Sequence, residues 1–439
     1  MTALRLFVIL TAVFSSLATY FVPRLDASGD EPHYLVMAQS LWREHDLDLR
    51  DNYAREDWRE FRSGPTNPHY AAPRQDGRPF PGHAPGLPFL LAPIYALGAR
   101  LACVLLLGAM VAAVGALAFW IATREGLSPG AALLAGILAS GPPLAAFALH
   151  VYAEAPSALA LFAAYGLLRF GPRDRAAGLS AALACLLPFL HPRMAAGSIA
   201  IGAAAFLFRH RASPRVFAGV AVLGALGYGL FWMSIFGSPT ALGMYGGLPE
   251  DADFNPAQAL MGLLFDRAYG ILPVAPAFIA LFLIRPPARE SAEATAWVRV
   301  EVVMVLAVLL PVLFWRVWWG GQSPPARLIA PMTPFLALWM ARAWEGMSAL
   351  ARRLVVVAAV WSWGLFFFAA LQPGRMLFIN RRVRPARLWE ALWPGGPIDG
   401  ILPDLARPES SDWTIAAAWL LALIACVFLA RRAQAKAPA

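Results

Sequence analysis

The chain has 439 residues, of which 59% are hydrophobic and only 14% are charged. A mean hydropathy of +0.57 excludes a soluble globular domain of this length and indicates a polytopic membrane protein. The net charge of +9 does not indicate nucleic-acid binding, because the basic residues lie at the ends of apolar runs and form no basic face with interleaved aromatic residues.

The first predicted element is an apolar helix over residues 4–23, which is long for a signal peptide and lacks a small-residue cleavage site before Arg24. We expect it to remain as a membrane helix. Apolar runs long enough to span a bilayer predict an all-α fold with about twelve membrane helices in one domain, 1–439. The runs are 4–23, 101–122, 129–149, 154–170, 176–191, 194–208, 216–236, 268–285, 298–316, 327–344, 353–371 and 413–430.

Basic residues predict the orientation of these helices. With the N-terminus in the cytoplasm, the inner loops collect arginines and the C-terminus is also cytoplasmic, in agreement with the positive-inside rule. The long polar segment 24–85 and the ends of several later helices then face outward, and they hold nearly all the polar residues suited to chemistry. The inner-face residues are Arg124, Arg169, Arg173, Arg175, Arg209, Arg211, Arg215, Arg285, Arg289, Arg352, Arg353, Arg431, Arg432 and Lys436.

The first outer loop, 24–100, opens with adjacent acids in "GDEPHYLVMAQSLW". Asp30 and Glu31 precede apolar residues at helical spacing, which predicts a short amphipathic helix along the membrane surface. Two interpretations of the acids stay open. They cap this helix, or a carboxylate held at the membrane face acts as general base towards a lipid-carried substrate.

The rest of this loop contains two further candidates. In "DLDLRDNY", Asp46 and Asp48 resemble a metal-binding Asp-x-Asp pair, but nearby arginines favour a solvated, internally paired surface. The run 84–98 is broken by prolines and is predicted to be an interfacial or re-entrant helix. His83 stands at its start, either as a turn histidine bonded to backbone or as a contact to an anionic head group.

Later helix ends add candidates at the outer face. "ALHVYAEAP" brings His150, Tyr152 and Glu154 to a helix start, where Glu154 is either a cap or a site residue. "LHPRM" places His191 and Arg193 in a tight outer turn, where an arginine is unfavourable unless it binds an anion such as phosphate.

Two more outer segments follow. "FWRVWWGGQSPPARLIAP" holds Arg316 and Arg327, and the planar fork of an arginine suits bidentate binding of a phosphate. Snorkelling to the head groups is the alternative for both arginines. "LLFDRAYG" adds Tyr269 beside Asp266, and a helix cap is the alternative for Asp266.

Three patches resemble the GT-C superfamily of membrane glycosyltransferases. "GDEPHYLVMAQSL" is similar to the Asp-Glu motif of lipid A aminoarabinose transferases and protein O-mannosyltransferases. "GHAPGLPFLL" is similar to their His/Lys-Pro-Pro segment, with Ala84 in place of the first proline. "PPARLIAPMTPFLAL" is similar to the Arg-Tyr-x-x-Pro helix start of bacterial members, with Leu328 replacing the tyrosine.

The resemblance implies an inverting glycosyltransferase of the bacterial inner membrane, with a polyprenyl-phosphate-linked sugar as donor and a periplasmic active site. Asp30 would be the catalytic base and Glu31 its partner, while His83, Arg327 and Arg193 would face the donor phosphate. The Asp-Glu motif favours chemistry without a metal cofactor, although Asp46 and Asp48 keep a divalent metal open. A lipid-linked-sugar transporter and a glycan ligase or polymerase are the alternatives; the acceptor and the sugar stay open. Further pocket candidates are His150, Glu154, His191, Arg316 and Tyr269.

Overall fold

The structure is a computed structural model that describes residues 1–245, 255–283, 291–380 and 386–436. Within these ranges the chain is helical, and β-structure is limited to two isolated bridges. The helices are α1 Ala3–Phe21, α2 Glu31–Arg43, α3 Arg50–Ala54, α4 Gly86–Arg124, α5 Pro129–Ala139, α6 Glu154–Phe170, α7 Arg173–Leu190, α8 Ala195–Leu207, α9 Pro214–Phe236, α10 Pro256–Phe265, α11 Ile271–Val274, α12 Ala280–Leu283, α13 Ala292–Leu313, α14 Thr333–Trp344, α15 Ala349–Ala370, α16 Arg387–Leu392, α17 Ile398–Ile401 and α18 Ser410–Lys436.

Among the described residues, six helices are long and apolar enough to cross a membrane. The all-helical membrane architecture is therefore confirmed, but the expected count of about twelve spans is not. The candidate spans are Ala3–Arg24, Gly86–Arg124, Pro214–Met244, Ala292–Leu313, Ala349–Ala370 and Ser410–Ala430.

Several predicted spans prove to be short buried helices joined to irregular backbone. The run 129–149 becomes the 11-residue α5, which ends just before Gly141, Pro142 and Pro143 and is followed by the 3-10 helix η3 (Leu144–Ala148). The run 327–344 begins with the 3-10 helix η7 (Arg327–Met332) before the 12-residue α14. Because protein covers these stretches, irregular backbone is tolerated at membrane depth, and hydropathy alone reads each stretch as one span. The predicted run 268–285 ends outside the described residues.

The interfacial segment predicted over 84–98 is continuous with the next span but sharply kinked from it. α4 contains both, with non-helical backbone at Gly98 (φ 176°, ψ 35°) and Ala99 (φ 48°, ψ −137°). The positive φ of Ala99 is costly for a residue with a Cβ, so the kink must be maintained by its surroundings. Arg100 begins the second part of the helix and, as described below, bonds to the N-terminal region.

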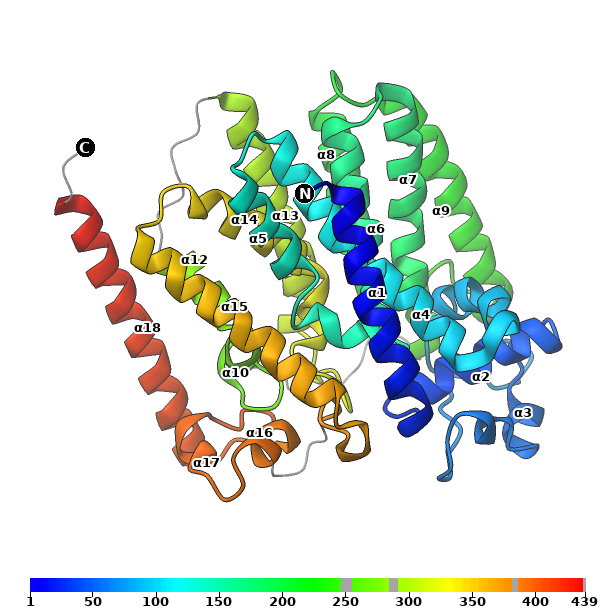
Figure 1. Cartoon of the computed structure of the whole chain (residues 1–439). Coiled ribbons are helices and arrows are strands. Elements are labelled where there is room, and N and C mark those ends of the chain that lie inside the picture. Colours follow the sequence, from blue (N-terminus) through cyan, green and yellow to red (C-terminus); the bar gives the residue numbers. More distant parts are fainter. Residues whose placement is uncertain (246–254, 284–290, 381–385, 437–439) are drawn as a thin grey trace.

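The short helices of the first loop and those near the C-terminus lie at one end of the helix bundle. α2 and α3 lie at the same end as α16 and α17, whereas α1 begins and α18 finishes at the other end (Figure 1). α1 packs chiefly on α4 through a face spaced three and four residues apart, which includes Leu6, Leu10, Phe14 and Phe21. The outer loop predicted from the sequence thus forms a layer over one end of the bundle.

A buried charge cluster, which we call the inner cluster, lies among the other helices. Arg342 of α14 donates to Glu125 Oε2 at 2.6 Å and to Glu301 Oε1 at 2.7 Å, and Arg169 of α6 pairs with the same two glutamates. Trp339 donates to Glu301 Oε2 at 2.8 Å. The charges balance and are hydrogen-bonded, as buried ions must be. Sequence analysis assigned Arg169 to topology and did not identify this cluster.

Candidate functional site

Asp30 immediately precedes α2, yet its side chain makes no capping hydrogen bond. Its Oδ2 lies 2.6 Å from Nη2 of Arg327, at the start of η7. The Arg327 side chain is buried, whereas that of Asp30 is 25% exposed. Asp30 therefore occupies the cap position of α2, but its carboxylate pairs with an arginine that lies far away in the sequence. Part of that carboxylate stays accessible to solvent.

Tyr152 fastens the start of α2 to the loop before η7. Its hydroxyl donates to the carbonyl oxygen of Gln322 at 2.9 Å and accepts from the backbone N–H of Asp30 at 3.2 Å. The Arg327 guanidinium stacks over its ring at 4.5 Å. Gly29, at φ +64°, permits this close approach, because a Cβ there would stand 2.0 Å from the Tyr152 hydroxyl.

Glu154 forms ion pairs with both Arg327, the partner of Asp30, and Arg193. It begins α6 and is fully buried, and its Oε1 accepts from Nε of Arg327 at 3.1 Å and from Nη2 of Arg193 at 3.2 Å. Nε and Nη1 of Arg193 are buried without a hydrogen-bond partner among the described residues. Buried guanidinium N–H groups of this kind are suited to an incoming anion. We call Asp30, Glu154, Arg193 and Arg327 the outer charge cluster.

The charges in this cluster set the protonation of Asp30. Burial acts to raise the pKa of the Asp30 carboxyl, but the Arg327 guanidinium together with His83 and His33 outweighs it, and the pKa lies below its ordinary value. Asp30 is therefore a carboxylate at neutral pH, the form that a proton acceptor requires.

Glu31 faces away from Asp30 into the protein. It is fully buried, and its Oε1 accepts from Nε of Arg100 at 2.8 Å. Arg100 also donates to the carbonyl oxygen of Leu25, so the pair ties the start of α2 to the kink of α4. His150 is likewise buried, between the rings of Phe21 and Phe378, and burial lowers its pKa to about 4.

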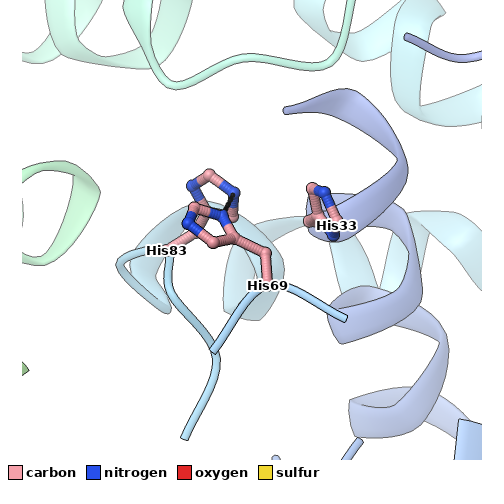
Figure 2. Close-up of side chains that lie close together, drawn as sticks. All are labelled: His33, His69 and His83. Carbon is pink, nitrogen blue, oxygen red and sulfur yellow. Dashed lines mark hydrogen bonds between the residues drawn. The ribbon is translucent and has the colours of Figure 1, made fainter. Parts of the chain in front are cut away.

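His83 lies in a group of three histidines beside Asp30. Figure 2 shows His83 and His69 from the first loop facing His33 of α2. His69 Nδ1 and His83 Nε2 are 3.1 Å apart and share a hydrogen bond, and the ring of His33 stacks on that of His83 at 5.4 Å. Asp30 is near enough for its charge to act on both His33 and His83.

The remaining candidates differ in their positions. His191 accepts from the backbone N–H of Arg193 at 3.3 Å and so borders the outer charge cluster. The backbone carbonyl of Tyr269 accepts from Ala326 N–H at 2.9 Å, which supports the residue before Arg327. Arg316 is exposed and, among the described residues, takes no part in the ion pairs of the cluster. The sequence therefore predicted most of the candidate site residues, and the structure shows which of them contact one another.

The Asp-x-Asp pair forms the internally paired surface that the sequence favoured. Asp48 makes a two-pronged ion pair with Arg50, through contacts of 2.8 and 2.6 Å. Asp46 accepts from the Ser40 hydroxyl at 3.1 Å and from the Asp48 N–H at 3.0 Å. Both carboxylates are thus engaged locally.

Three residues of this region were missed: Arg100, His33 and His69. Arg100 is a single charge beginning an otherwise apolar run, a rare placement that calls for a buried partner. His33 lies three residues after Asp30, within one helical turn. Nothing in the sequence pairs His69 with His83, because their approach depends on the fold of the loop between them.

The fold is shared with crystal structures of ArnT from Cupriavidus metallidurans. The apo form gives a TM-score of 0.52 at 14% identity, and the form bound to undecaprenyl phosphate gives 0.54 at 15% identity. Each match covers 98% of this chain and 72% of the ArnT chain. No protein-family model matches the chain, and no curated protein matches its sequence. The resemblance to GT-C membrane glycosyltransferases is thereby confirmed at the level of the fold.

Proposed function

We propose that the protein is a glycosyltransferase that moves a sugar from a polyprenyl-phosphate donor to an acceptor at the outer face of a bacterial inner membrane. The observation that carries this proposal is the partly exposed Asp30 carboxylate, held by Arg327 beside the unpartnered N–H groups of Arg193. A base next to an anion site is what transfer from a phosphate-linked sugar needs. The fold supports it, since one ArnT structure with this fold is bound to undecaprenyl phosphate.

The reaction is a single displacement. Asp30 accepts the proton of the acceptor hydroxyl or amine as that atom attacks the anomeric carbon. The bond from that carbon to the phosphate oxygen breaks, its electron pair stays on the lipid phosphate, and the sugar configuration inverts. Arg327 and Arg193 stabilise the growing phosphate charge, which lowers the barrier in addition to binding the donor.

Donor binding also prepares the base. In the structure Arg327 is shared between Asp30 and Glu154. A donor phosphate competes for the same guanidinium, so the attraction that depresses the pKa of Asp30 weakens when the donor is bound, and Asp30 becomes a stronger base. Glu154 keeps both arginines in position during this exchange.

An apolar pocket reaches Pro325, close to Arg327 in the chain, and we propose that it receives part of the donor lipid. Its lining includes Pro142 and Pro143 after α5, Pro325 of the loop before η7, and Phe366 and Phe378. Pro325 is two residues before Arg327 in the chain, which connects this pocket with the outer charge cluster. Transfer of a hydrocarbon chain into such a lining is favourable.

The test is transfer by the purified protein in lipid vesicles, with a panel of labelled polyprenyl-phosphate sugars and membrane acceptors. We expect Asp30→Asn to lower transfer by about 100-fold or more, the scale of general-base catalysis, while donor binding survives. Asp48→Asn, which changes an aspartate paired with Arg50 in the same loop, is the matched control and should keep full activity.

Normal transfer by Asp30→Asn would remove Asp30 from the mechanism. If no donor in the panel is consumed by the wild type, while labelled lipid-linked sugar crosses the vesicle membrane, the protein is a transporter and the glycosyltransferase proposal fails.

A further inference from the structure

The group of His33, His69 and His83, which we call the histidine cluster, has the composition of a metal site. Each ring offers one nitrogen, and the three nitrogens lie within 4.8 Å of one another (Figure 2). Around a tetrahedral Zn²⁺ with bonds of about 2.0 to 2.1 Å, ligand nitrogens stand roughly 3.3 Å apart. The contact of 3.1 Å between His69 and His83 is close to this spacing, and the His33 ring would have to move towards them for all three nitrogens to bind one ion.

The backbone holds His69 and His83 together. The loop pairs its own ends: the N–H of Gly82 donates to the carbonyl of His69 at 2.8 Å, and Ala71 bonds to Phe80 at the same distance. Gly82 allows the His69 ring to pack closely against the backbone, because a Cβ at this position would come within 3.1 Å of the ring and the ring would have to shift. Two ligands are therefore presented side by side before any ion binds, which reduces the ordering cost of binding.

The third ligand is oriented from α2. The Tyr53 hydroxyl hydrogen-bonds to Nδ1 of His33 at 2.7 Å, which leaves the other ring nitrogen for an ion. Metal-binding histidines commonly use their second nitrogen in this way, to fix the ring.

We infer that His33, His69 and His83 bind a divalent transition-metal ion of the Zn²⁺ class, with a fourth coordination position open beside Asp30. Three imidazoles suit Zn²⁺ better than Mg²⁺ or Ca²⁺, which prefer oxygen ligands. Three protein ligands with one open position is the pattern of zinc sites that meet a substrate rather than purely structural ones.

The ion would have two consequences. It would tie the first loop to α2, because His69 and His83 belong to the loop and His33 belongs to the helix. Resting on the proposed function, it would also present a positive charge near Asp30, so that an anionic donor contacts His83 through the ion. Binding itself does not depend on that function.

The experiment measures metal binding by tag-free, chelator-treated full-length protein in detergent, titrated with Zn²⁺ against a chromophoric chelator and with Co²⁺ for its visible spectrum. We expect one Zn²⁺ per chain and an intense, tetrahedral-type Co²⁺ spectrum. His69→Gln and His33→Gln should each weaken binding at least 10-fold. The matched control is His45→Asn, which changes an exposed histidine of the same outer loop at a φ of 64° that asparagine tolerates, and it should bind like the wild type.

Absence of stoichiometric binding by the wild type would overturn the inference, as would equal binding by His69→Gln. His69 is exposed, so its variant should fold, and an unchanged elution profile would verify this. Zn²⁺ binding without any transfer activity would leave the metal site standing and count against the glycosyltransferase. Sugar transfer without Zn²⁺ binding would overturn the metal site and leave the glycosyltransferase proposal standing.

Discussion

Burial raises the pKa of the Asp30 carboxyl, whereas the Arg327 guanidinium, together with His83 and His33, lowers it. The lowering groups prevail, so the carboxyl is charged at neutral pH. Asp30 and Glu31 are adjacent in the chain, yet Glu31 faces a different arginine and is fully buried. Two neighbouring acids thus have different environments, and only Asp30 keeps an exposed edge, so we assign Glu31 a positioning role.

The ionisation of Asp30 predicts how the rate of transfer depends on pH. In the wild type the acid limb of kcat/KM for transfer should lie below pH 3.8, the ordinary value for an aspartate, because a base works only when deprotonated. Arg327→Gln removes the opposing charge and leaves burial, so the limb should move to higher pH. Transfer rates across pH, with limiting donor, measure it.

Arg316→Gln is the control for this shift, because Arg316 is exposed and the charges that act on Asp30 are those of Arg327, His83 and His33. Its acid limb should stay at the wild-type position. An unmoved limb in Arg327→Gln would show that another group controls the acid side of the profile.

At the scale of the helices, buried ion pairs join helices that lie far apart in the sequence. Arg100 lies just after the kink of α4, and its bonds to Glu31 and to the Leu25 carbonyl attach α2 to the membrane helices. The inner cluster does the same for α4, α6, α13 and α14. Hydrophobic packing alone specifies helix association poorly in a membrane, where lipid is as apolar as leucine.

We predict that Arg100→Met destabilises the protein by about 3 to 5 kcal/mol, since it leaves the Glu31 charge buried and unpaired. The apparent thermal midpoint in detergent should fall accordingly. Arg43→Met breaks the exposed pair with Glu60, whose side chains are 51% and 35% accessible, and should cost at most about 1 kcal/mol. Equal midpoints for the two variants would contradict a structural role for the Glu31–Arg100 pair.

Over the whole molecule, the outer charge cluster and the histidine cluster adjoin one another, and both contain residues of the first loop. That loop covers the end of the bundle opposite the start of α1 (Figure 1). The positive-inside rule puts the arginine-tipped turns predicted from the sequence in the cytoplasm, so we expect the proposed site to face outward.

Cysteine labelling in intact cells measures this topology. We expect Asn67→Cys, in the exposed first loop, to react with a membrane-impermeant maleimide, and Arg209→Cys, at the end of α8, to react only after the cells are opened. Both substitutions are made with the native cysteines replaced, because Cys426 is exposed. Reaction of Arg209→Cys in intact cells would reverse the orientation and move the site to the cytoplasm.

The sequence by itself determined the membrane class, the all-helical architecture and most of the residues of the candidate site, because apolar length, helical spacing and charged ends are local properties. It did not determine the number of spans, since a short buried helix such as α5 and its irregular neighbour have the hydropathy of one span. Nor did it distinguish the partners of Asp30 and Glu31, or reveal that His33 and His69 join His83. Those pairings join residues that lie from 14 to almost 300 positions apart, and only the packing of the helices and the first loop brings such residues within bonding distance.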